Sequence, residues 1–178
     1  MSEGSSSVGR RIQVSVVGYN EDSCTKEAYD AAYRVGKAVA AKGGLVVCGG
    51  LGGVMEAVCK GARDGGGHSL GIVPSADAAQ ANLHCDVVVA TGLGNARNFL
   101  VAYSGDAMVI VGGGAGTLIE AAAAYQAGKP VVAVRGTGGV ADDLAGKFID
   151  ARRSSKVIDA AGPEAAVEKA IEEAGKGR

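Results

Sequence analysis

The chain has 178 residues, 18 of them Lys or Arg and 19 Asp or Glu, for a net charge of −1, and it contains 30 Gly but only 4% aromatic residues. The near cancellation of charge, with no stripe of basic residues, argues against nonspecific nucleic-acid binding as the main task, and few aromatic rings are present to stack on bases. The longest apolar run is far shorter than the roughly 20 residues that a membrane-spanning helix requires, so no membrane partner is expected.

Residues 1–10 are rich in Ser and Gly and are expected to form a disordered tail, followed by a single domain over residues 11–178. In this domain, short β-branched runs alternate with segments of helical periodicity. In chain order, the predicted elements are a strand at 12–17, a helix at 23–42, a strand at 45–48, a helix at 53–64, strands at 68–73 and 86–90, a helix at 95–104, a strand at 106–111, a helix at 117–127, strands at 130–134 and 156–158, and a helix from 163 onward.

This alternation, with strands that are apolar throughout, is typical of a parallel sheet covered on both faces. The predicted fold class is therefore α/β, a Rossmann-like doubly wound parallel sheet in a three-layer sandwich. Such sheets bind ligands beyond the carboxyl ends of their strands, near the topological switch point. Four segments follow strands at that edge: GYNED (18–22), GGLGG (49–53), TGLGNARN (91–98) and GGGAGT (112–117). The irregular segment 75–85 could cover the same edge.

Two of these segments are glycine-rich loops that join a strand to a helix. Gly allows positive φ and a close approach of the backbone to a ligand, and the free amides at a helix start attract anions. The segment GGGAGT predicts a phosphate cradle, with Thr117 either adding a hydroxyl or serving only as the N-cap of its helix. The predicted ligand-binding glycines are Gly49, Gly50, Gly52, Gly53, Gly113, Gly114 and Gly116. Neither loop matches GxGxxG or GxxxxGK[ST], which argues against a nicotinamide-dependent dehydrogenase and a P-loop ATPase.

Charged and amide side chains near these loops are further candidates. Glu120 lies one turn inside its predicted helix and should point back toward the strand ends, where it is a candidate acid, base or hydroxyl-binding group. Glu56 occupies the matching place after GGLGG. Either carboxylate could instead be a surface partner of the helix dipole. Arg97 and Asn98 begin the helix after the fourth strand, where an Arg fork suits a phosphate or carboxylate, although Arg97 could also be an ordinary surface residue.

The four cysteines, Cys24, Cys48, Cys59 and Cys85, form no CxxC pair and have no His at zinc-ligand spacing. No secretory segment is recognised before them, so a reduced, cytoplasmic setting is expected. We interpret Cys48 and Cys59 as small buried hydrophobes, and no metal site is predicted.

The helix TLIEAAAAYQAG is apolar on nearly every face, although only one face can meet the sheet. We therefore expect the remaining face to contact a second subunit. The predicted assembly is a homodimer or tetramer in which the helices after the fourth and fifth strands form the contact. Alternatively, the C-terminal segment of the same chain covers that face.

In these motifs the chain resembles the LOG-like (SLOG) superfamily, once labelled possible lysine decarboxylases. Within it, the chain is similar to the branch related to molybdenum cofactor carrier proteins and more distantly to DprA/Smf. The resemblance runs from about residue 12 to 170 and includes GGLGGVMEAVCKGARDGGG, GIVP, TGLGNARN and DAMVIVGGGAGTLIEAAAAYQAGKPVV. It implies a Rossmann-like fold. Lysine decarboxylation is not favoured, because no pyridoxal-binding lysine motif is recognisable.

The LOG enzymes cleave the N-glycosidic bond of nucleoside 5′-monophosphates through PGGxGTxxE and an Arg-Lys pair. This chain has Gly112 in place of the proline and Arg97-Asn98 in place of the pair. The resemblance therefore implies two functions. One is a binding protein for a phosphate-bearing molecule, a nucleotide monophosphate or a molybdenum cofactor, with no cofactor required for chemistry. The other is a phosphoribohydrolase acting on AMP or a cytokinin-riboside monophosphate, with Glu120 and Arg97 as catalytic residues. A DprA-like nucleic-acid partner is a third, weaker interpretation, because the basic surface is missing.

Overall fold

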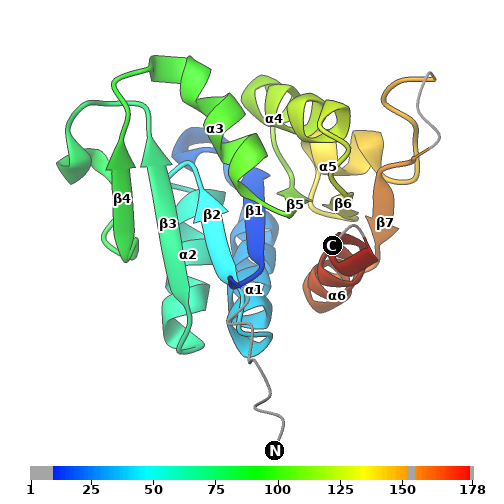
Figure 1. Cartoon of the computed structure of the whole chain (residues 1–178), viewed down its shortest axis with the longest axis horizontal. Helices are drawn as coiled ribbons and strands as arrows, with labels where there is room; N and C mark the ends of the chain where they lie inside the picture. The colour runs from blue at the N-terminus through cyan, green and yellow to red at the C-terminus, as the bar shows by residue number, and fades with distance from the viewer. Residues whose placement is uncertain (1–9, 152–154, 177–178) are drawn as a thin grey trace, which may run out of the picture.

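The computed structural model describes residues 10–151 and 155–176, in which seven strands alternate with helices (Figure 1). The strands are β1 (Gln13–Gly18), β2 (Leu45–Cys48), β3 (His68–Val73), β4 (Val87–Ala90), β5 (Ala107–Val111), β6 (Val131–Val134) and β7 (Ile158–Ala160). The α-helices are α1 (Lys26–Ala41), α2 (Val54–Asp64), α3 (Arg97–Ser104), α4 (Ala115–Gln126), α5 (Gly139–Leu144) and α6 (Pro163–Lys176). Short 3₁₀ turns lie at Glu21–Ser23, Ala78–Gln80 and Gly94–Ala96.

All seven strands form one parallel sheet in the order β4-β3-β2-β1-β5-β6-β7. The chain winds outward from β1 in one direction and then outward from β5 in the other. The topological switch point therefore lies between β1 and β5, which pair in register with Val16 opposite Val109. This confirms the predicted α/β doubly wound fold. It also places the two loops that follow β1 and β5 next to each other at the carboxyl edge.

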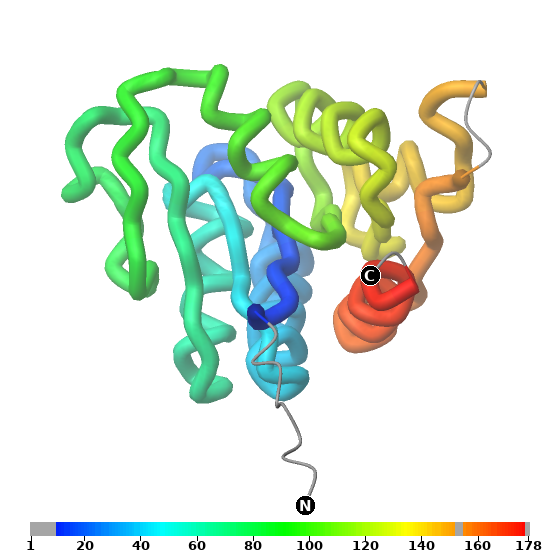
Figure 2. The backbone as a smooth tube through the Cα atoms, viewed as in Figure 1, coloured from blue at the N-terminus to red at the C-terminus, as the bar shows by residue number. Residues whose placement is uncertain are grey.

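Helices cover both faces of the sheet and divide the core into two layers. On one face, α1, α2 and α6 pack through residues such as Val35, Val58 and Val167. On the other face, α3, α4 and α5 pack through Val101, Ala124 and neighbouring side chains. In Figure 2 the chain between β4 and α3 passes above the strand ends, so that α3 begins at the carboxyl edge of the sheet.

The predicted elements agree with the structure apart from their ends and one missed helix. β7 lies two residues later than predicted, and α4 begins at Ala115 rather than residue 117, because Gly114 serves as its N-cap. The missed helix is α5, which has Gly138 as its N-cap and Gly139 as its first residue, both at positive φ, in a stretch that reads as a loop. Val140 and Ala141 pack into the core, and their amides donate hydrogen bonds to the carbonyls of Gly113 and Gly112, so contacts with distant residues hold this helix in place.

Residues 1–9 of the expected tail lie outside the described residues, and Arg10 is exposed. Among the described residues, no helix is both long enough and apolar enough to span a bilayer.

Candidate functional site

A cavity of about 450 Å³ opens at the carboxyl edge of the sheet, over the switch point between β1 and β5. Segments from four different strand ends meet around it. Its lining consists of Val17, Gly18, Tyr19, Asn20, Ser23, Gly49, Leu51, Met55, Asn95, Arg97, Asn98, Gly114, Ala115, Gly116, Thr117 and Glu120. Four segments that the sequence analysis placed at this edge therefore contribute to one cavity.

The glycines of the GGGAGT loop have two different structural roles. Gly112 and Gly113 adopt positive φ, 61° and 104°, and make the turn that leaves β5. Gly114 has φ of −123°, which any residue can adopt, so the positive φ expected for this loop does not extend to Gly114. A β-carbon at Gly114 would meet no atom within 4 Å. The absence of side chains at Gly114 and the neighbouring Gly116 leaves the cavity floor open to a ligand.

The start of α4 presents backbone amides on this floor. The N-cap residue of α4, Gly114, has no side chain to accept a hydrogen bond from the first amides of the helix. The first turn of α4 also contains no acidic residue. The residues of that turn, from Gly114 to Thr117, line the cavity. Amides at a helix N-terminus, with the positive end of the helix dipole, attract anions.

Thr117 is buried at the edge of the cavity, and its hydroxyl donates a hydrogen bond of 3.1 Å to the carbonyl of Gly18. Because Thr117 lies inside α4, the alternative interpretation of this residue as an N-cap is wrong. Its hydroxyl instead joins the first turn of α4 to the end of β1.

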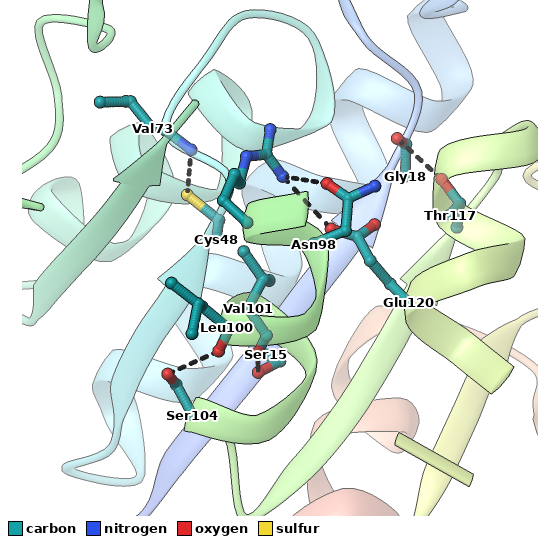
Figure 3. Close-up of polar contacts among 12 residues, drawn as sticks. Ser15, Gly18, Cys48, Val73, Asn98, Leu100, Val101, Ser104, Thr117 and Glu120 are labelled. Carbon is teal, nitrogen blue, oxygen red and sulfur yellow. Dashed lines mark hydrogen bonds and ion pairs between the residues drawn. The ribbon is translucent and has the colours of Figure 1, made fainter. Parts of the chain in front are cut away.

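Three polar side chains from α3 and α4 form the wall of the cavity. Arg97 and Asn98 are each 8% exposed and Glu120 is 6% exposed. The Arg97 Nη1 atom donates to Asn98 Oδ1 at 2.8 Å and lies 3.4 Å from Glu120 Oε1. Figure 3 shows Asn98 and Glu120 side by side at this guanidinium group. The Nε atom of Arg97 is buried without a hydrogen-bond partner among the described residues, which leaves a donor for a ligand.

Burial is the main influence on the pKa values of Glu120 and Arg97. It raises the pKa of Glu120 to about 7, against the opposing effect of the Arg97 charge. Burial also lowers the pKa of Arg97, although the charge of Glu120 acts in the opposite direction. The Arg97–Glu120 contact thus compensates only part of the cost of removing both groups from water. A carboxyl group with this pKa can accept or donate a proton near neutral pH.

The GGLGG loop contributes less to the cavity than the sequence analysis expected. Gly49 lines it, and a β-carbon there would lie 2.6 Å from Arg97 Nη2, so this glycine makes room for the guanidinium. Gly50 and Gly53 adopt positive φ and shape the turn instead, and neither of them lines the cavity. Gly113, in the other loop, likewise lies outside the lining.

Glu56 is placed differently from Glu120, although the two residues hold matching places in the sequence. Together with Gly52, Glu56 lines an adjacent cavity of about 430 Å³, which shares Asn20 and Leu51 with the first, and its carboxylate accepts a hydrogen bond of 3.2 Å from the Tyr29 hydroxyl. Glu56 therefore does not line the cavity over the switch point, and its part in ligand binding stays a prediction. The side chain at this position of α2 points toward α1 rather than toward the switch point.

The sequence analysis did not select several residues that line the cavity, among them Tyr19, Asn20 and Asn95. Tyr19 and Asn20 could have been selected from the sequence, because they belong to GYNED, the segment that follows the central strand β1. Tyr19 also supports the GGGAGT turn, since a β-carbon at Gly112 would lie 2.2 Å from its ring.

Comparisons with known proteins agree with this architecture. An uncharacterized protein from Archaeoglobus fulgidus is 44% identical over 124 residues, which cover 70% of this chain and 80% of that protein. The molybdenum cofactor binding protein from Rippkaea orientalis is 31% identical, with a TM-score of 0.81 over 92% of this chain and 97% of the other. The Moco carrier protein from Chlamydomonas reinhardtii is 32% identical, with a TM-score of 0.81 over 94% and 99% of the two chains.

DNA processing protein A (DprA) from Streptococcus pneumoniae shares the fold at a TM-score of 0.64 and 17% identity, over 92% of this chain and 62% of that one. At this identity the likeness concerns the fold alone. A family model matches residues 11–167, nearly the whole of the sheet and its helices, and so the chain belongs to the SLOG cluster4 family.

Proposed function

We propose that this protein binds a phosphate-bearing small molecule, a nucleoside monophosphate or a molybdopterin-like cofactor, in the cavity over the switch point. The observation that carries the proposal is the buried Arg97 Nε, which has no partner among the described residues, beside the uncapped start of α4. A phosphate between the two would accept hydrogen bonds from the guanidinium and from the amides of the first turn.

The size and shape of the cavity support a ligand of this kind. Its volume of about 450 Å³ lies within the usual range for small-molecule sites. Gly114 and Gly116 leave the phosphate end open, and Asn20, Asn95 and Asn98 add amide groups that suit the polar edge of a pterin or a purine.

The molybdenum cofactor is the first choice of ligand, because the binding protein from Rippkaea orientalis and the carrier protein from Chlamydomonas reinhardtii resemble this chain over nearly its whole length. In such a role the cofactor is cargo, and the metal would serve redox chemistry only in an enzyme that receives it. The residues of this chain would hold the cargo by its phosphate and keep water from its buried part.

The second candidate function is hydrolysis of a nucleoside 5′-monophosphate, and the position of Glu120 favours it. The carboxyl group lies in the cavity with its pKa raised to about 7, and the ionised form would stabilise positive charge developing on a ribose. Asn98 stands where the LOG enzymes have a Lys, and the missing cation would make cleavage slow.

A ligand-identification experiment tests the proposal. Native mass spectrometry of the purified protein, followed by denaturation, reports the mass of a co-purified ligand. Titration calorimetry with AMP, inorganic phosphate and a phosphorylated pterin then measures affinity, with the Arg97→Gln variant as comparison. We expect binding that weakens in Arg97→Gln. Absence of binding for all three probes in the folded wild-type protein would contradict both candidate functions.

We further propose a homodimer or tetramer assembled through α3 and α4. These helices lie side by side (Figure 1) and expose five large apolar side chains: Phe99, Leu100, Tyr103, Leu118 and Ile119, each 39–52% exposed. A patch of this kind on two adjacent helices is typical of a protein interface. Because α3 and α4 also carry Arg97 and Glu120, association would hold the cavity wall in place.

A further inference from the structure

The sulfur atoms of three cysteines converge at one point, although their spacing along the chain predicted no metal site. The Sγ atoms of Cys48 and Cys59 are 3.4 Å apart, and those of Cys59 and Cys85 are 3.6 Å apart. All three lie within 4.8 Å of one another, and no other group of three or more metal-ligand side chains is found among the described residues.

We propose that Cys48, Cys59 and Cys85 bind one thiophilic d¹⁰ cation, Zn²⁺ or Cu⁺, through their three sulfur atoms. Zinc–sulfur bonds of about 2.3 Å in tetrahedral geometry place neighbouring sulfurs about 3.8 Å apart. The two short separations differ from this value by only a few tenths of an ångström, and the Cys48–Cys85 separation is at most 4.8 Å, so shifts of the side chains would bring all three sulfurs to one ion. The thiol protons pass to solvent as the ion binds.

The fold builds this cluster from three separate elements. Cys48 ends β2, Cys59 lies on the buried face of α2, and Cys85 lies in the loop before β4. Gly71 of β3 provides the space for Cys85, because a β-carbon at that position would lie 2.7 Å from its sulfur. A small residue in the middle of a buried strand is otherwise unfavourable, and here it brings the third sulfur against the other two.

The surroundings of the cluster suit a charged metal–thiolate centre. The Gly50 amide donates to Cys48 Sγ at 3.4 Å, a contact that stabilises a thiolate. Three thiolates around a divalent ion carry a net charge of −1. The Arg97 guanidinium, which lies against Gly49 directly after Cys48, provides a nearby positive charge. Cys48 and Cys59 are fully buried, whereas Cys85 is partly exposed and offers the route by which an ion enters.

A disulfide is the competing use of these thiols, and the geometry disfavours it. A disulfide needs sulfur atoms about 2.05 Å apart, so Cys48 and Cys59 would have to approach by more than 1 Å in a packed core. It would also leave the third sulfur without a role. Three thiols around one point match a metal site better than any pair of them matches a cross-link.

The test uses the full chain, reduced, stripped of metal and then titrated with Zn²⁺ in air-free buffer, or with Cu⁺ in a second arm. Native mass spectrometry and elemental analysis count ions per chain, and Cd²⁺ reports thiolate ligation by its charge-transfer absorption in the ultraviolet. We expect one ion per chain in the wild-type protein and in Cys24→Ser, whose sulfur is outside the cluster. In Cys85→Ser we expect affinity to fall at least about tenfold.

A second measurement needs no variant. The metal should slow alkylation of Cys85 by iodoacetamide in the wild-type protein and leave the rate at Cys24 unchanged. The proposal would be overturned by a folded, reduced wild-type chain that takes up no ion, or by equal affinity in folded Cys85→Ser. A Cys48–Cys59 disulfide in the purified protein, with no metal uptake after reduction, would also overturn it.

Discussion

Replacing Gly114 with Val separates ligand binding from stability more cleanly than other changes in the cavity. Gly114 is exposed, its φ of −123° is accessible to Val, and its β-carbon would meet no protein atom within 4 Å. The variant should therefore fold, with a loss of stability of about 1 kcal/mol because Val is less favourable than Gly at an N-cap. Its side chain would occupy the space at the start of α4 in which we propose the phosphate lies.

The size of the effect follows from the contacts that Val displaces. A hydrogen bond to a charged group contributes about 1.5–3 kcal/mol, so losing one raises the dissociation constant about 10- to 150-fold. At a ligand concentration about 100 times the wild-type dissociation constant, the wild-type protein gains about 2.7 kcal/mol of stability. A tenfold weaker variant gains about 1.4 kcal/mol under the same conditions. For a chain of this size the rise in Tm falls from about 5–11 °C to about 3–6 °C.

The assay is a thermal melt of both proteins with and without AMP, inorganic phosphate or a phosphorylated pterin, accompanied by titration calorimetry. Gly162→Val is the matched control, because Gly162 also has an open β-carbon position but does not line the cavity. The control should bind like the wild-type protein. Equal ligand affinity in folded Gly114→Val and in the wild-type protein would refute the placement of the phosphate at this loop.

Three further predictions concern Asn98, Glu120 and the exposed patch. Asn98→Lys should gain some release of adenine from AMP, measured by chromatography, and Glu120→Ala in the same chain should abolish it; brisk cleavage by the wild-type protein would contradict the carrier interpretation. Since the pKa of Glu120 is raised to about 7, the folded state retains a proton that the unfolded state loses above its pKa of about 4.5, so stability falls as pH rises from about 4.5 to 7. The loss amounts to about 3 kcal/mol at most and should be missing in Glu120→Gln, which urea unfolding at pH 5 and 8 would measure; identical pH dependence in both proteins would contradict it. Leu118→Glu should convert the proposed dimer to a monomer in sedimentation, whereas Phe148→Glu, at an exposed apolar residue outside α3 and α4, should not; a wild-type protein that is monomeric at micromolar concentration would rule the dimer out.

The fold could be predicted from the sequence because its signals are local. Apolar runs such as 45–48 and 68–73 match β2 and β3 residue for residue. A segment of helical periodicity between two such runs indicates a helix that carries the chain back across the sheet, so that the two strands run parallel. Doubly wound topology then places every strand-to-helix loop at the carboxyl edge. For this reason the sequence alone indicated where the cavity would lie and that Gly114, Arg97 and Glu120 were candidates to line it.

The orientation of individual side chains depends on packing between distant elements. Glu56 and Glu120 hold equivalent places after two similar loops, yet Glu120 faces Arg97 and Glu56 faces Tyr29, because α2 and α4 cover opposite faces of the sheet. Likewise, the gap that Gly71 leaves in β3 brings Cys85 to Cys59, a contact between residues 26 positions apart that no spacing rule contains. Such contacts arise only when the helices and loops are packed on the sheet, since burial and steric exclusion act between neighbours in space rather than along the chain.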